Sequence, residues 1–294
     1  MALSFTTTLI ASGALCAKHL HAAAALLRDA GVVVNDAHWL DAGEAAVLPC
    51  VGEKTAARGA LGPLLDEMDI IVGHSRAARL IIADMDSTMI EVECIDELAD
   101  FAGLKSEIAA ITHAAMQGEI DFVGALERRV ALLAGLDAAV IDHCLAERVT
   151  IMPGARTLLA TMRANGAHGV LVSGGFMPFA EPVAAQIGFD RAIANQLEIA
   201  DGRLTGRVVG DIVDSATKLS VLHTEMLAAG LTSDDVLAVG DGANDAPMLR
   251  AAGLGIAYRA HAIAEAAADA AIRHHDLSAI LWAQGHPRAQ WVVS

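Results

Sequence analysis

A short apolar run, Ile81-Ile82-Ala83, ends in two carboxylates, Asp84 and Asp86, that stand one residue apart. An apolar stretch that stops at charged residues is typical of a buried parallel strand whose C-terminal end faces a site. Alternate residues of extended chain point the same way, so both carboxylates can reach one group. They can share a proton or hold a cation between them, and both arrangements suit phosphoryl transfer. The pattern is short, however, and taken alone it favours a solvated acidic loop.

From residue 79 onward, apolar strands alternate with helical segments, which predicts an α/β fold with a parallel sheet and crossover helices. The expected strands are 80–83, 169–172, 236–239 and 255–257. Polar or small residues follow the first three of them: Asp84 to Asp86, Ser173-Gly174-Gly175 and Gly240-Asp241-Gly242. Open α/β sheets bind ligands at the carboxyl ends of their strands, so we expect these clusters to converge.

A long insertion at 93–149 separates the first two of these strands and has helical periodicity throughout. An all-helical insertion at this place is expected to form a cap over the site. Further along, 194–209 reads as a β-hairpin centred on Asp201-Gly202. The tail from 260 reads as Ala-rich helix plus a short final segment, without chemistry.

Residues 1–78 are expected to form a separate unit. The predicted order is strand 3–11, helix 15–30, strand 32–35, strand 45–51, helix 54–68 and strand 69–72. This βαββαβ order predicts a ferredoxin-like α+β domain and resembles the ACT-type regulatory domain in the order of its elements. No ligand-binding signature stands out, so a structural or dimerising module remains open.

Composition narrows the class of protein further. The length of 294 residues favours two domains, and 54% hydrophobic residues supply ample core. A net charge of −16 argues against a general nucleic-acid surface. The four cysteines are far apart, which indicates buried thiols in a reducing compartment and not a zinc site or disulfide framework. No apolar run is long enough to span a bilayer, and the N-terminus lacks a basic segment, so we expect a cytoplasmic protein.

Three further elements are candidates for binding phosphate and metal. The hydroxyl of Ser173 and the backbone N–H groups after it can bind phosphate oxygens, although Ser-Gly-Gly alone is only a turn. Asp241 and Asp245, with Asn244 between them, offer hard oxygen ligands that suit Mg²⁺. Lys218 is a candidate cation for the phosphate, although a single Lys is usually a solvated residue.

Together these elements are more specific than any one alone. The run Asp84-Met85-Asp86-Ser87-Thr88, then Ser173, Lys218 and Gly240 to Asp245 resemble, in this order, the haloacid dehalogenase-like phosphohydrolases. Within that superfamily, four stretches are similar to the phosphoserine phosphatases: 84–103, 116–133, 172–176 and 239–245. The resemblance covers most of 79–285. It implies a three-layer, Rossmann-like core at 79–294 with the helical cap inserted after the first strand, while 1–78 is the variable part of the family.

The resemblance also implies roles for the residues. Asp84 would attack phosphorus to form an aspartyl-phosphate, and Asp86 would protonate the leaving hydroxyl and then take a proton from water. Mg²⁺ would be held by the Asp84 carboxylate, the Asp86 carbonyl and Asp241, with Asp245 close behind them.

The implied substrate is O-phosphoserine, and the implied pathway step is the last one of serine biosynthesis. Its phosphoryl group would be held by Ser173, Gly174, Lys218 and Asn244. Glu93 would bind the ammonium group and Arg129 the carboxylate. Met116 and Phe122 would be apolar cap contacts.

Two other interpretations remain open. A related small-molecule phosphomonoesterase, or a transferase that passes the phosphoryl group to another alcohol such as homoserine, would use the same motifs. A sensor that binds amino acids through 1–78 is disfavoured, because a sensor needs neither a nucleophile nor its acid. The oligomeric state, a homodimer included, is left open by the sequence.

Overall fold

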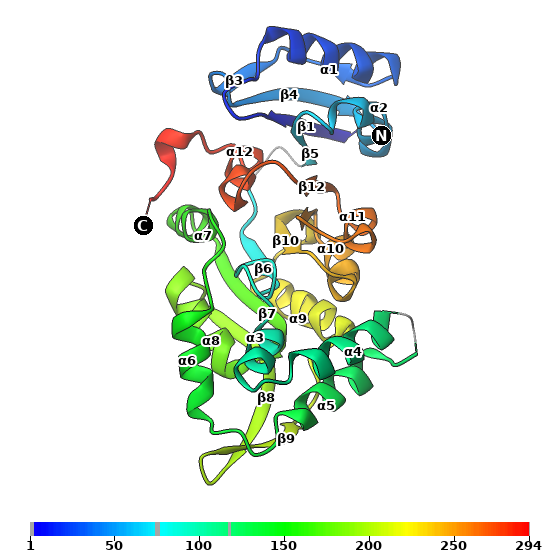
Figure 1. The fold of residues 1–294 in the computed structure, drawn as a ribbon. Helices are drawn as coiled ribbons and strands as arrows, with labels where there is room; N and C mark the ends of the chain where they lie inside the picture. The colour runs from blue at the N-terminus through cyan, green and yellow to red at the C-terminus, as the bar shows by residue number, and fades with distance from the viewer. Residues whose placement is uncertain (1–2, 74–76, 117–118, 294) are drawn as a thin grey trace.

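The computed structural model describes residues 3–73, 77–116 and 119–293. Its largest element is a seven-stranded sheet with the order β12-β11-β10-β6-β7-β8-β9, in which only β9 runs antiparallel to its neighbour (Figure 1). The strands are β6 (Leu80–Ala83), β7 (His168–Phe176), β8 (Arg191–Ala200), β9 (Arg203–Val209), β10 (Val236–Gly240), β11 (Leu254–Tyr258) and β12 (Ala270–Ile272). The predicted parallel sheet is confirmed. The hairpin of β8 and β9 joins it through β8, an extension that was not predicted.

Helices cover both faces of this sheet, and the side chains of β6 point alternately to one face and the other. Ile81 packs on one face with α7 (Ala155–Ala164) and α8 (Met177–Ile187), while Ile82 packs on the other with α9 (Ser215–Ala228) and α10 (Ala246–Ala251). Successive side chains of a strand point to opposite faces, so a strand buried on both faces must be apolar throughout. All four residues of β6 are buried. This burial fixes the position of the residues that follow β6.

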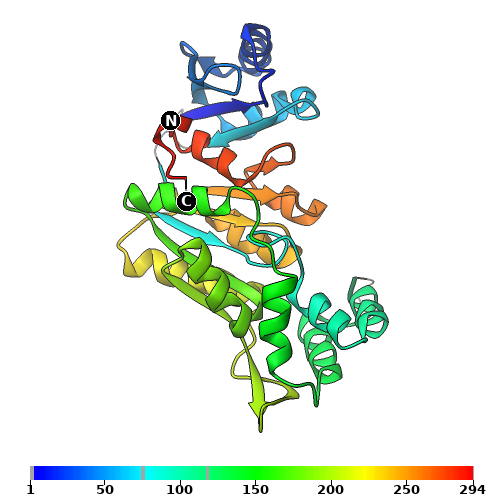
Figure 2. The same ribbon diagram turned by 60° about the vertical axis from the view of Figure 1, so that its left-hand side comes forward.

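The insertion between β6 and β7 is helical, as predicted. It consists of α3 (Cys94–Phe101), α4 (Lys105–Met116), α5 (Phe122–Leu132) and α6 (Ala139–Glu147). The Asp121 side chain starts α5 by accepting the Gly124 N–H at 2.7 Å. The β8–β9 hairpin lies beside α5, and backbone hydrogen bonds join Leu204 of β9 to Gly135 and Leu136 (Figure 2). The inserted helices are therefore braced by the outermost hairpin of the sheet.

The N-terminal unit has an antiparallel sheet of its own. It contains β1 (Leu3–Ile10), α1 (Ala17–Asp29), β2 (Val33–Val34), β3 (His38–Asp41), β4 (Ala45–Gly52), α2 (Lys54–Ala60) and β5 (Asp69–Gly73). The strand order is β2-β4-β1-β5, with β3 also paired to β4. The helix predicted at 54–68 was too long, because Gly62-Pro63 follows α2 and forms a 3₁₀ turn with Leu64.

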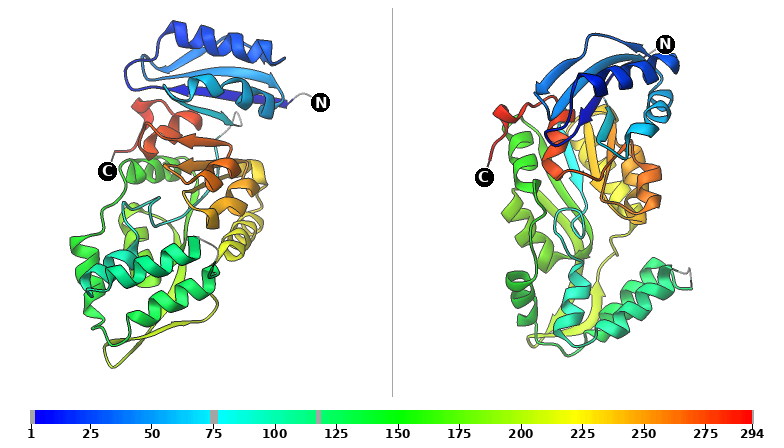
Figure 3. Two further views of the ribbon diagram at one scale, coloured as in Figure 1. Left: turned by 45° about the vertical axis from the view of Figure 1, so that its right-hand side comes forward. Right: turned by 45° about the horizontal axis from the view of Figure 1, so that its top comes forward.

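The C-terminal tail lies between this unit and the large sheet (Figure 3). The Asp69 carboxylate, buried at the start of β5, accepts the N–H groups of Arg273, His274 and His275. Ile10 and Ile71 belong to the same apolar cluster as the sheet core. The tail, read from sequence as helix without chemistry, also contains strand β12 and forms this contact. No helix among the described residues is both long and apolar enough to cross a membrane.

Candidate active site

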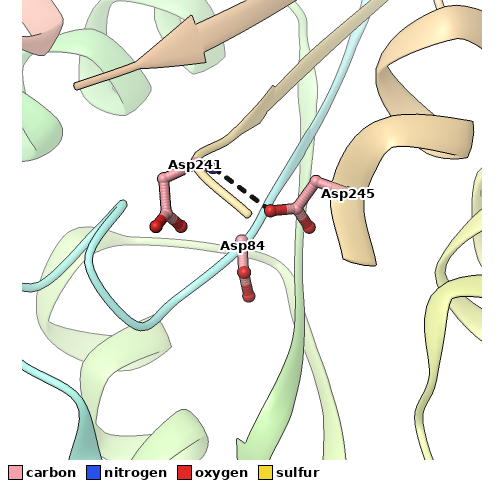
Figure 4. Close-up of side chains that lie close together, drawn as sticks. All are labelled: Asp84, Asp241 and Asp245. Atoms are coloured by element: carbon pink, nitrogen blue, oxygen red, sulfur yellow. Dashed lines mark hydrogen bonds between the residues drawn. The ribbon is translucent and has the colours of Figure 1, made fainter. Parts of the chain in front are cut away.

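The carboxyl ends of β6, β7 and β10 meet at one edge of the sheet, as the sequence predicts. Asp84 follows β6 directly, and its N–H continues the ladder by donating to the Val239 carbonyl at 3.0 Å. Asp241 follows β10, and Asp245 lies in the 3₁₀ turn after it. One oxygen from each of these three carboxylates lies within 4.8 Å of the others (Figure 4). Three acidic groups so close together favour either a compensating cation or a proton on one of them.

Lys218 supplies one compensating charge from the first turn of α9. Its Nζ lies 2.8 Å from Asp84 Oδ2 and 2.7 Å from Asp245 Oδ1, and the side chain is fully buried. Burial alone would lower the pKa of Lys218, but the Asp245 and Asp84 carboxylates raise it above its ordinary value. Lys218 therefore remains a cation. Burial and the nearby Asp245 raise the pKa of Asp84, and further positive charge at this site would lower it.

The same three carboxylates fit a divalent metal ion. The oxygens of Asp245 are engaged, Oδ1 by Lys218 and Oδ2 by the N–H groups of Asp241 and Gly242. Asp241 accepts the Thr88 hydroxyl at 2.9 Å, and burial together with Asp245 raises its pKa to about 6. An all-oxygen, anionic donor set suits Mg²⁺. Both oxygens of Asp84 are engaged as well, Oδ1 by the Met85 N–H at 2.7 Å and Oδ2 by Lys218, whereas Asp241 accepts the Thr88 hydroxyl through Oδ1.

Asp86 has different surroundings. Its Oδ1 accepts the Cys94 N–H at 3.0 Å, and its Oδ2 accepts the Ser173 hydroxyl at 3.3 Å. Burial, followed by the charge of Glu93, raises the pKa of Asp86 to about 7. Asp86 can therefore give and take a proton near neutral pH, whereas Asp84 is held beside a permanent cation. The two carboxylates of the motif are thus chemically distinct.

The Ser173-Gly174-Gly175 segment bulges out of the β7–β8 ladder. The Ser173 hydroxyl accepts the Gly175 N–H at 2.8 Å. A Cβ atom on Gly174 would lie 3.2 Å from Cζ of Phe122, and one on Gly175 only 2.5 Å from Oδ2 of Asp86. Gly175 therefore has no room for a Cβ atom unless Asp86 moves, whereas a Cβ atom at Gly174 would require the Phe122 ring to shift by a few tenths of an ångström.

A cavity of about 410 Å³ lies between these strand ends and the inserted helices. Its walls include the predicted site residues Asp84, Asp86, Glu93, Phe122, Arg129, Ser173, Gly174, Asp241 and Asn244. Glu93 accepts the Ser87 hydroxyl at 2.7 Å, and Arg129 Nε donates to the Ala125 carbonyl at 3.4 Å. Among the described residues, Glu93 and Arg129 form no ion pair with each other. Both charges remain available within one cavity.

Two predicted site residues of the described part of the chain, Lys218 and Asp245, do not line this cavity. Lys218 contacts Asp84 from the protein interior. The side chain of Met116 lies outside the described residues. The sequence indicated no role for Thr88, which donates to Asp241, or for His261, which lines the cavity. Thr88 lies within the Asp84 motif, so its hydroxyl was a visible signal, whereas His261 had none.

Residues 81–250 match the family model of the haloacid dehalogenase-like hydrolases. Among curated relatives, a phosphoserine phosphatase of Streptomyces coelicolor is 48% identical over 74% of this chain and 53% of its own length. That of Idiomarina loihiensis is 45% identical over 69% of this chain and 91% of its own length. The chain spans about half the length of the two curated relatives that are 48% identical to it.

A solved structure of a probable phosphoserine phosphatase from Vibrio cholerae covers 98% of this chain and 88% of its own, with a TM-score of 0.76 and 32% identity. The similarity therefore extends over both the large sheet and the N-terminal unit. The family match itself rests on the segment that contains Asp84, Ser173, Lys218 and Asp241. The chain belongs to the haloacid dehalogenase-like hydrolase family.

Proposed function

We propose that this chain is a phosphoserine phosphatase, which hydrolyses O-phosphoserine to serine and phosphate in the last step of serine biosynthesis. The observation that carries the proposal is the single cavity in which Glu93 and Arg129 face the Asp84 and Asp86 carboxylates without pairing with each other. A zwitterionic amino acid needs one anion and one forked cation, and this cavity offers both. The names of the curated relatives support the same substrate.

In the proposed reaction, a carboxylate oxygen of Asp84 attacks phosphorus, and the bond from phosphorus to the serine oxygen breaks. Asp86 donates its proton to that oxygen, so serine leaves as an alcohol. The ionised Asp86 then takes a proton from a water molecule, whose oxygen attacks the phosphorus of the aspartyl-phosphate. Phosphate leaves and the Asp84 carboxylate is restored. A pKa of about 7 suits Asp86 to both proton transfers.

Mg²⁺ is the proposed cofactor. Asp84, the backbone carbonyl of Asp86 and Asp241 would hold it, and Asp245 would orient this group through its bonds to Asp241 and Lys218. When bound, the ion neutralises charge on the nucleophile and the phosphoryl oxygens. The fit rests on the oxygen-only donors of the acidic cluster.

The substrate contacts are proposed residue by residue. Ser173, the Gly174 N–H and Asn244 would hold phosphoryl oxygens at the strand ends, and Lys218 would add its charge from behind Asp84. Phe122, 37% exposed at the start of α5, would pack on the substrate, and we assign the same role to Met116. The inserted helices would act as a cap that excludes water while the aspartyl-phosphate exists.

For the rest of the chain we propose a division into 1–78 and 79–294. The strand order β2-β4-β1-β5 supports a ferredoxin-like, ACT-like unit at 1–78, with a regulatory or dimerising role. We also propose a cytoplasmic location, which fits a chain whose four cysteines are free thiols.

The proposal is tested by measuring phosphate release from a panel of phosphomonoesters, with Mg²⁺ and with a chelator. We expect O-phosphoserine to give the highest kcat/KM, activity to require the metal, and Asp84 to carry the trapped phosphoryl group in mass spectra. Higher kcat/KM for a monoester without amino and carboxyl groups would contradict the assignment. Consumption of phosphoserine only when homoserine is added, with the phosphoryl group recovered on homoserine and not as free phosphate, would indicate the transferase instead.

A further inference from the structure

Asn195 is a buried amide that the motifs do not include. It lies on β8 with 1% of its surface exposed. Its Nδ2 donates to the Gly174 carbonyl at 2.7 Å, and its Oδ1 accepts the Val213 N–H at 2.8 Å. A carbonyl only accepts and an N–H only donates, so the orientation of the amide is fixed by its partners. An ionised Asp could make one of these bonds, and an apolar residue could make neither.

The bulge in β7 explains why such a bridge is needed. Val172 pairs with Ile193 and Phe176 with Asn195, so four residue steps of β7 lie opposite two steps of β8. The residues between Val172 and Phe176 leave the ladder, and the Gly174 carbonyl loses the partner that a regular strand would give it. The Asn195 side chain supplies that partner.

The second bond of Asn195 leads to another part of the site. Val213 precedes Asp214, which starts α9 by accepting the Thr217 N–H at 2.8 Å, and the Lys218 N–H donates to the Asp214 carbonyl. The Val213 carbonyl also lies close to Gly174, since a Cβ atom placed on Gly174 would be 3.6 Å from the Val213 oxygen. One amide therefore joins the bulged loop to the first turn of the helix that carries Lys218.

We propose that Asn195 is a positioning residue that holds the Gly174 N–H and the Lys218 ammonium group at the right places to act on the same phosphoryl group. Asn195 does not itself line the cavity, and it acts from behind the wall through its bond to Gly174. Both groups it positions belong to the proposed phosphate site, so this inference rests on the proposed function. The role concerns the phosphoryl group alone, which every phosphomonoester carries.

The test compares Asn195→Ala and Asn195→Asp with Thr161→Val. Thr161 is fully buried on α7 away from the cavity, and its hydroxyl accepts the Val292 N–H at 2.8 Å. Each variant loses at least one hydrogen bond between a buried side chain and the backbone. Asn195→Asp has the size of the original and can still accept the Val213 N–H, so it remains informative if the Ala variant does not fold.

We expect both Asn195 variants to lose about 10-fold to 100-fold in kcat per folded molecule, because a small misplacement of binding groups has effects of this size. Phosphoserine and p-nitrophenyl phosphate should lose equal proportions, and the dissociation constant for inorganic phosphate, measured by calorimetry, should rise about 10-fold or more. Thr161→Val should lower Tm but leave kcat and phosphate affinity within twofold. Kinetic constants of the Asn195 variants within twofold of wild type, with only Tm lowered, would overturn the proposal.

The result of this comparison can be distinguished from the result of the test of the proposed substrate. A wild-type chain that turns over p-nitrophenyl phosphate but not phosphoserine would refute the substrate assignment, and the Asn195 comparison would still be made with the first compound. If the chain hydrolyses no monoester, the phosphate dissociation constants decide: an unchanged value in Asn195→Ala overturns the positioning role, and a weakened one supports it.

Discussion

Replacing Lys218 by Met should destabilise the protein by removing the cation between Asp84 and Asp245 while nearly conserving side-chain length. At 2.7 to 2.8 Å, each contact is worth about 6 kcal/mol of gross Coulomb attraction at an effective dielectric constant of about 20. Desolvation of the charges offsets much of this, and breaking a buried pair costs about 3 to 5 kcal/mol net. In a chain of this length that loss corresponds to a fall in Tm of about 6 to 10 °C.

The assay is thermal unfolding at pH 8 and pH 5 with divalent metal chelated. Without the ammonium group, the native state gains by protonating one carboxylate, so the deficit of Lys218→Met should shrink as the pH falls. Arg207→Met is the matched control, because Arg207 pairs with Glu198 at 2.7 Å but is 72% exposed. It should cost less than about 1 kcal/mol. A Lys218→Met deficit no larger than that of the control, or one that grows toward pH 5, would refute the reasoning.

Three further predictions follow from the site and from the contact between the units. Arg129→Lys should lower kcat/KM for phosphoserine roughly 30-fold to several thousand-fold, a loss of about 2 to 5 kcal/mol in transition-state binding, and should affect phosphoethanolamine much less. Equal losses for the two substrates in steady-state assays would exclude the carboxylate role. Asp86 must carry a proton to act as the acid, so the rate of cleavage should fall as the pH rises through about 7. Glu93→Gln removes one cause of the raised pKa and should therefore move the midpoint of the pH–rate profile to lower pH, and an unmoved or higher midpoint would contradict the assigned cause. Burial alone would raise the pKa of Asp69, but hydrogen bonds from His275 and the backbone N–H groups lower it, so this carboxylate stabilises the fold above its unfolded pKa and loses that contribution as pH falls. Asp69→Asn should therefore lower Tm more at pH 7 than at pH 3.5, and a deficit independent of pH would argue against the ionised contact.

The sequence predicted the sheet edge well because each element there has a strong local signal. Asp84 and Asp241 end apolar strands, and parallel strands bring their carboxyl ends together whatever the details of packing. The partners of these residues carried no such signal. Asn195 sits inside a hairpin strand, and its value depends on a bulge in β7 that no periodicity reveals.

The tail was the least predictable part for a related reason. The residues of β12 are Ala270, Ala271 and Ile272, and alanine favours helix over strand when local preference alone decides. Pairing with β11 overrides that preference. The N–H groups that follow β12 bond a carboxylate that is 204 to 206 residues away in the sequence, a separation that no local pattern encodes.

That separation has a consequence for synthesis of the chain. Asp69 leaves the ribosome 204 to 206 residues ahead of its partners Arg273, His274 and His275. The apolar surface of Ile10 and Ile71 therefore stays partly uncovered while the residues in between are made. Apolar surface that is exposed for this long invites misassembly. We expect a released chain truncated before Arg273 to be cut by protease faster than the full chain. Equal protease sensitivity of the two chains would show that the units dock without the tail.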